Sequence, residues 1–118
     1  MSDQLQIDVM GRRAFAPGER VPVAVAWELE RAPEVLSLEL AWSTEGKGTT
    51  DTAAAFRQEW IDGAAGPAGA EVIDVVMPAG PLTRDGKLIS IGWALVLRAD
   101  GAKSEMPIVL QRAGQPWA

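Results

Sequence analysis

The stretch Val21-Pro22-Val23-Ala24-Val25-Ala26-Trp27-Glu28-Leu29 decides the fold class. Its odd positions hold Val, Val, Val, Trp and Leu, whereas its even positions hold Pro, Ala, Ala and Glu. Successive side chains of a strand point to opposite faces of the sheet, so this period of two predicts a strand with one buried face.

The same alternation occurs in two further stretches of the chain. The apolar positions of these two runs are Leu36, Leu38, Leu40 and Trp42 in the first, and Ile89, Ile91, Trp93, Leu95 and Leu97 in the second. Each of the three runs therefore places one Trp in phase with aliphatic residues. This phase predicts that Trp27, Trp42 and Trp93 point inward and form much of a core, because buried indoles remove a large apolar area from water.

Shorter runs and turn residues complete the pattern. Residues 5–9, 72–76 and 108–110 are typical of short strands, and turn sequences such as Asp85-Gly86 and Asp100-Gly101 separate the runs. About seven short strands punctuated in this way predict a single immunoglobulin-like antiparallel β-sandwich. We expect the sandwich domain to occupy residues 1–112 and a short C-terminal tail to occupy residues 113–118.

The segment 52–60 fits two structures. Its alanines, and the spacing of four between Phe56 and Trp60, favour a helical turn or two. Its even positions, Ala54, Phe56, Gln58 and Trp60, also fit one face of a strand. The surrounding β pattern favours the strand, but the residues alone leave the choice open, as they do the exposure of Trp60 and Trp117.

Composition and charge exclude several functions. The 118 residues include no Cys, His or Tyr, so thiol nucleophiles, imidazole bases and Cys/His zinc sites are excluded. The net charge of −5 and the scattered basic residues argue against binding to nucleic acid. No window approaches 18 apolar residues, and the first residues do not resemble a signal peptide, so we expect a cytoplasmic protein without membrane insertion.

No motif carries chemistry. The stretch Gly46-Lys47-Gly48-Thr49-Thr50 invites comparison with a phosphate-binding loop, but Ala41 stands at the first glycine position and Gly48 at the hydroxyl position. Acid pairs such as Glu28 and Glu39 are expected on solvated outer faces. We therefore predict no catalytic residues, no cofactor and no metal site, and a protein that is not an enzyme.

The other face of the predicted strands, with residues such as Ala24, Ala41 and Ala94, is small and weakly apolar, unlike the charged outer face that an antiparallel sheet usually presents to water. Such a face suits a second copy in a homodimer, a partner protein or an overlying loop. The other explanation is that the alanines reflect a GC-rich genome and not a binding surface. Unpaired edge strands offer a second docking mode. The predicted interaction residues are Ala24, Ala26 and Gly92 of the outer faces and Glu45, Gly46, Lys47, Gly48, Thr49 and Thr50 of a loop.

The order of several motifs resembles arrestin-fold domains. Residues 15–21, Phe-Ala-Pro-Gly-Glu-Arg-Val, resemble the aromatic-x-Pro-Gly-Glu-x-Val opening of that family. Residues 77–81, Met-Pro-Ala-Gly-Pro, and residues 86–93, Gly-Lys-Leu-Ile-Ser-Ile-Gly-Trp, resemble its downstream segment. Residues 40–48 are similar to a stretch of uncharacterised bacterial arrestin-like proteins, of the sporulation-control type.

The resemblance implies a fold like the arrestin N-domain and the role of an adaptor. Members of the family bind other proteins through loops and sheet faces, and usually carry two sandwiches in tandem, whereas 118 residues accommodate one. A second copy could replace the missing sandwich. We therefore expect a non-enzymatic protein-binding module whose partner is unknown. The alternative is a sandwich that binds carbohydrate or another small ligand on an exposed Trp60 or Trp117.

Overall fold

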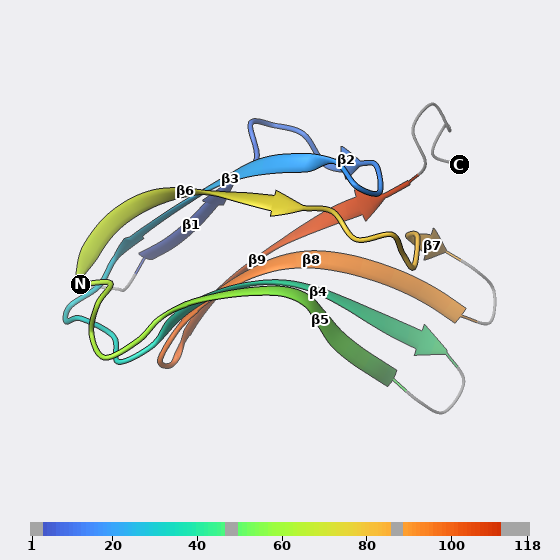
Figure 1. Ribbon diagram of the computed structural model, residues 1–118. Coiled ribbons are helices and arrows are strands. Elements are labelled where there is room, and N and C mark those ends of the chain that lie inside the picture. The colour runs from blue at the N-terminus through green and yellow to red at the C-terminus, as the bar shows by residue number, and fades with distance from the viewer. Residues whose placement is uncertain (1–3, 47–49, 86–88, 112–118) are drawn as a thin grey trace.

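The computed structural model describes residues 4–46, 50–85 and 89–111, and the strands in these ranges form two stacked sheets (Figure 1). The smaller sheet is antiparallel and has the strand order β1 (Gln4–Asp8), β3 (Arg20–Glu28), β6 (Ala68–Val76). The larger sheet has the order β2 (Ala14–Phe15), β9 (Ala102–Leu110), β8 (Ile89–Ala99), β4 (Leu36–Gly46), β5 (Thr50–Trp60), and β7 (Arg84–Asp85) pairs with β8.

The prediction of an all-β sandwich is confirmed, with two short strands that the sequence did not indicate. The described residues form nine strands rather than about seven. Two of the nine, β2 and β7, are only two residues long, and no alternation can show in so short a segment. The pairing of β2 with β9 is parallel, so the larger sheet is mixed rather than purely antiparallel.

The core lies between the facing sides of the two sheets. Val21, Val23, Val25 and Trp27 of β3 are buried, as their phase predicts, and the apolar positions of β4 and β8 face them. Trp93 is also buried, but Trp42 is only half-buried against the core. In Figure 1 the end of β4 and the beginnings of β5 and β8 extend beyond the smaller sheet.

Segment 52–60 is a strand, because β5 pairs with β4 along its whole length. The local preference for helix is overridden by this pairing. The register shifts between Leu40, which faces Phe56, and Ala41, which faces Ala54, so Ala55 is an extra residue in a β-bulge. The prediction that Ala54 and Phe56 share one face of the strand is therefore wrong, because the extra residue of the bulge puts Ala54 on the opposite face.

Two strands begin earlier than predicted. β9 begins at Ala102 rather than at 108 and contains Pro107. A proline without an N–H is tolerated there because β2 pairs only with the last two residues of β9, so the outer side beside Pro107 is open. β6 begins at Ala68 rather than at 72.

The Asp100-Gly101 hairpin is confirmed by the pairing of Ala99 with Ala102, whereas Gly86 of the other predicted hairpin lies outside the described residues.

Candidate interaction surface

The structure separates the predicted interaction residues. Ala24 and Ala26 lie on the outer face of the smaller sheet, since they alternate with buried residues of β3. Gly92 belongs to β8 of the larger sheet and lies on its outer face. The two groups are therefore on opposite sides of the sandwich and cannot form one site within a single copy of the chain.

The predicted loop 45–50 is shorter than expected. Glu45 and Gly46 are the last residues of β4, and Thr50 is the first residue of β5. These residues extend the hairpin because β4 stays paired with β8 as far as Gly46, which faces Ile89. The remaining predicted residues, Lys47, Gly48 and Thr49, lie outside the described residues.

The outer face of the smaller sheet is the more apolar of the two. Its centre consists of Ala24, Ala26, Ala70 and Val72, and we call these four residues the apolar face. The apolar face lines a shallow hollow of about 380 Å³. Val72 is 68% exposed and lies beside Ala24 in the register of β3 and β6. Sequence reasoning placed Val72 in a strand but missed its exposure, although the alternation Ala70, Val72, Asp74 is a signal of one outward face.

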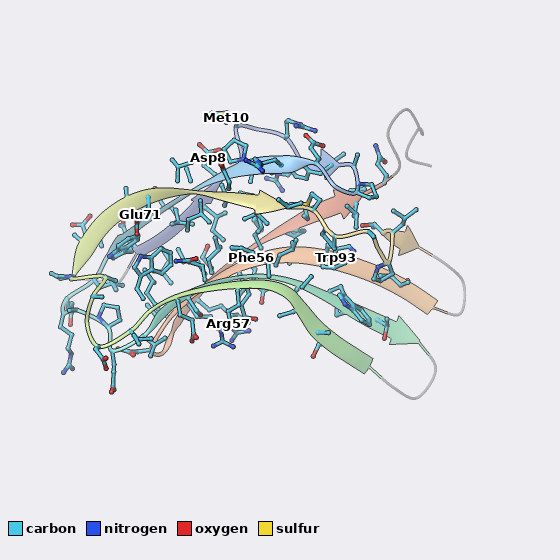
Figure 2. All side chains as sticks on the ribbon, in the orientation of Figure 1. Asp8, Met10, Phe56, Arg57, Glu71 and Trp93 are labelled. Carbon is cyan, nitrogen blue, oxygen red and sulfur yellow. The ribbon has the colours of Figure 1, made fainter. Side chains whose placement is uncertain are left out.

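The outer face of the larger sheet combines small residues with ion pairs. The small residues line a hollow of about 570 Å³ and are Ala41, Ser43, Thr52, Ala54, Gly92 and Ala94. Beside this hollow, the Arg57 guanidinium contacts the carboxylates of Glu39 at 3.5 Å and Glu59 at 3.1 Å. Figure 2 shows Arg57 on this outer side and its neighbour Phe56 on the inner side of β5.

A second ion pair on the larger sheet joins Lys103 Nζ to Glu105 Oε1 at 2.8 Å. The hydrogen bond and charge of Lys103 lower the pKa of Glu105. Val96, whose register partners are Glu39 and Glu105, is only 5% exposed although it lies on an outer face. Long charged side chains therefore cover much of this face, whereas the apolar face of the smaller sheet has no comparable cover in the described residues.

The segments that resemble the arrestin family meet in the structure. Gly18 donates its backbone N–H to Met77 O at 2.9 Å, and Met77 donates to Glu19 O at 2.8 Å. The Pro-Gly-Glu turn needs glycine because Gly18 has a φ of 78°. The Glu19 carboxylate accepts hydrogen bonds from the Ala16 N–H at 3.0 Å and from Arg12 Nη2 at 3.1 Å. These contacts hold the Pro-Gly-Glu turn against Met77.

The contacts of Glu19 predict a small dependence of stability on pH. The hydrogen bond from Arg12 and the Ala16 N–H lower the pKa of Glu19. A carboxylate with a lowered pKa in the folded state stabilises the protein above its ordinary pKa of about 4.3, and this contribution is lost as the pH falls through the lowered value. We expect Glu19→Gln to unfold at a slightly lower temperature than the wild type at pH 7, with the difference shrinking as the pH falls below the ordinary glutamate pKa of about 4.3. Glu28→Gln on the exposed end of β3 is the control. If the unfolding temperatures of both variants depended on pH in the same way, the expectation would be contradicted.

Trp60 does not form an open stacking platform. Its ring lies 5.8 Å from that of Trp27, its Nε1–H donates to Glu71 Oε2 at 2.5 Å, and the side chain is half-buried against the core. The indole thus links the edge strands β5 and β6. Trp117, the other residue on which the carbohydrate alternative depends, lies outside the described residues.

The two sheets and the joined turn segments define the class: the chain has an arrestin-like fold. The crystal structure of Spo0M, a sporulation control protein from Bacillus subtilis, superposes with a TM-score of 0.64 at 12% sequence identity. The match covers 94% of this chain and 50% of that chain, so this chain spans about half the length of Spo0M.

Comparison by sequence adds no relative to this structural likeness. No family model matches the chain, and no curated protein matches it. The arrestin-like fold expected from the motifs is confirmed by structure. Among the residues that the structure describes, no helix is long and apolar enough to cross a membrane.

Proposed function

We propose that the protein is a non-enzymatic, cytoplasmic adaptor of the arrestin-like type, which binds a partner protein through the apolar face of its smaller sheet. The observation that carries this proposal is the exposure of Val72 at the centre of a face otherwise built from alanines. The occupant we infer is a folded protein that presents apolar side chains of its own.

The composition of the apolar face supports this choice over the opposite face. The cores of protein interfaces are depleted of charged residues and bounded by a polar rim. Ala24, Ala26 and Val72 form such a centre, and Gln6 and Asp8 of β1 border it. The face of the larger sheet instead carries ion pairs beside its hollow, and a partner that covered them would have to desolvate those charges.

Replacing Ala24 by Glu tests the proposal. The new carboxylate would lie at the centre of the apolar face, and a partner would have to bury it without a counter-charge, so we expect partner affinity to fall roughly tenfold or more. Wild-type and variant proteins are used as bait in lysate of the source organism, and captured proteins are quantified by mass. We expect a set of proteins that the wild type captures and Ala24→Glu does not.

The matched control is Ala94→Glu, which places the same charge on the outer face of the larger sheet. Thermal unfolding of both variants verifies that neither substitution disrupts the sandwich. Capture that is retained by Ala94→Glu and lost by Ala24→Glu supports the apolar face. Capture that is equal for all three proteins, or lost only by Ala94→Glu, overturns the assignment.

A further inference from the structure

The sheet edges differ in how they are protected against pairing with another chain. Natural edges are usually short, bulged, charged or interrupted by proline. β1 is five residues long, and the open part of β9 carries Pro107 and the ion pair of Lys103 with Glu105. β5 carries the bulge at Ala55 and the charged Arg57.

β6 is neither short, bulged nor interrupted by proline, and its charged residues are Glu71 and Asp74. Its nine residues pair with β3 without a register shift, and the strand contains no proline. In the described part of the chain no strand pairs with its outer side. Seven of its nine residues are exposed, among them Val72 and Val76 at 68% and 53%. β6 therefore presents a long row of backbone hydrogen-bonding groups beside exposed β-branched side chains.

The sequence of β6 is complementary to itself in one antiparallel register. When Val72 faces Val72 of a second copy across a two-fold axis, all nine residues are paired. The outer faces of the two sheets then lie on the same side of the joined sheet. Glu71 then faces Ile73, and Asp74 faces Ala70, so neither acid lies directly opposite a like charge, and the two Glu71 residues are diagonal neighbours.

The neighbouring registers are less favourable. Centring on residue 71 or 74 sets Glu71 against Glu71 or Asp74 against Asp74, which is destabilising. Centring on Ile73 leaves Ala68 and Gly69 without partners. The register centred on Val72 is the longest that avoids both faults.

We propose that two copies of the chain pair antiparallel along β6, centred on Val72, so that two three-stranded sheets become one six-stranded sheet. The two apolar faces then lie side by side on one surface. This self-association goes beyond the adaptor function proposed above, because it needs no other protein.

A single cysteine tests the pairing. The chain has no cysteine, so Val72→Cys introduces the only thiol. Residues that face each other across an antiparallel pair have Cα atoms about 4.5–5.5 Å apart, within the range that a disulfide spans. After mild oxidation of the purified protein at high micromolar concentration, we expect most of Val72→Cys to run as a covalent dimer on a non-reducing gel.

Val76→Cys is the matched control, because it changes another exposed valine of the same strand. In the proposed register the two copies of residue 76 lie eight positions apart along the strand, about 26 Å, and cannot form a disulfide. Cross-linking of Val76→Cys to the same extent as Val72→Cys would overturn the register.

Sedimentation of the wild type gives an independent result. We expect a species of twice 12.6 kDa, and at least a tenfold weaker association for Val72→Lys, which sets two positive charges face to face at the axis. A wild type that sediments only as a monomer at high micromolar concentration overturns the proposal. Because only purified chain is present, the outcome does not depend on the partner binding tested with Ala24→Glu.

Discussion

Replacing Trp27 by Ala is expected to lower the free energy of unfolding by about 3–5 kcal/mol, the usual cost of truncating a buried aromatic residue to alanine. Trp27 is 6% exposed and packs in the core beside Trp60. Its Nε1–H also donates to the carbonyl oxygens of Ala65 and Gly66, at 3.2 and 3.3 Å. The substitution thus removes core packing and the bond that holds the turn before β6.

Denaturant unfolding at pH 7 measures the loss, with the slope of the transition monitored to verify two-state behaviour. Trp42→Ala is the control, because Trp42 has the same chemistry and is only half-buried. We expect its loss to be clearly smaller than that of Trp27→Ala. Equal losses at the two positions would mean that Trp27 does not have the central place in the core assigned to it.

Replacing Gly69 by Ala is expected to cost about 1–3 kcal/mol, as overpacking of a core does. A Cβ atom at Gly69 would lie 2.7 Å from Trp27 Cζ2 and 3.0 Å from Cε2. These atoms belong to a rigid, buried ring, so the clash cannot be relieved by a small rotation of a flexible chain. Gly92→Ala is the control, since its Cβ would meet nothing within 4 Å, and we expect it to be neutral or slightly stabilising.

A double-mutant cycle identifies the cause of this loss. In a Trp27→Leu background the ring atoms that meet the new Cβ are absent, so Gly69→Ala should lose most of its cost. Both free energies come from the same unfolding experiment. A cost that is unchanged in the Trp27→Leu background would show that Gly69 is required for its backbone and not for contact with the indole.

The fold was predictable where one face of a strand must be apolar. The alternation around Val23, Leu38 and Leu95 arises because these residues fill one core, and the structure buries all three. The two-residue strands β2 and β7 could not be predicted, since they form through pairing with β9 and β8 rather than through any local preference. The first part of β9 could not be predicted for a similar reason. A strand tolerates Pro107 only if no other strand pairs with that side of it, and the sequence does not show which strands pair.

The candidate surface was predictable only in part. The phase of the strand at 21–29 predicted that Ala24 and Ala26 point outward, and they do. The assignment of Gly92 to the opposite sheet depends on which strands pair over long distances, and alternation within β8 contains no information about that. The β-branched run at 72–76 did not show which of its residues point outward; Val72 is exposed on the outer face of β6, whereas Val75 of the same strand is buried.

The order of strands in the smaller sheet affects how the chain is made. β1 ends at residue 8 and β3 at residue 28, but β6, which pairs with the full length of β3, ends at residue 76. At the usual speed of a ribosome, roughly 5–20 residues per second, β3 therefore waits several seconds for that partner. The alternating valines of β3 stay exposed to solvent for longer still, because β8, which covers them from the larger sheet, ends only at residue 99.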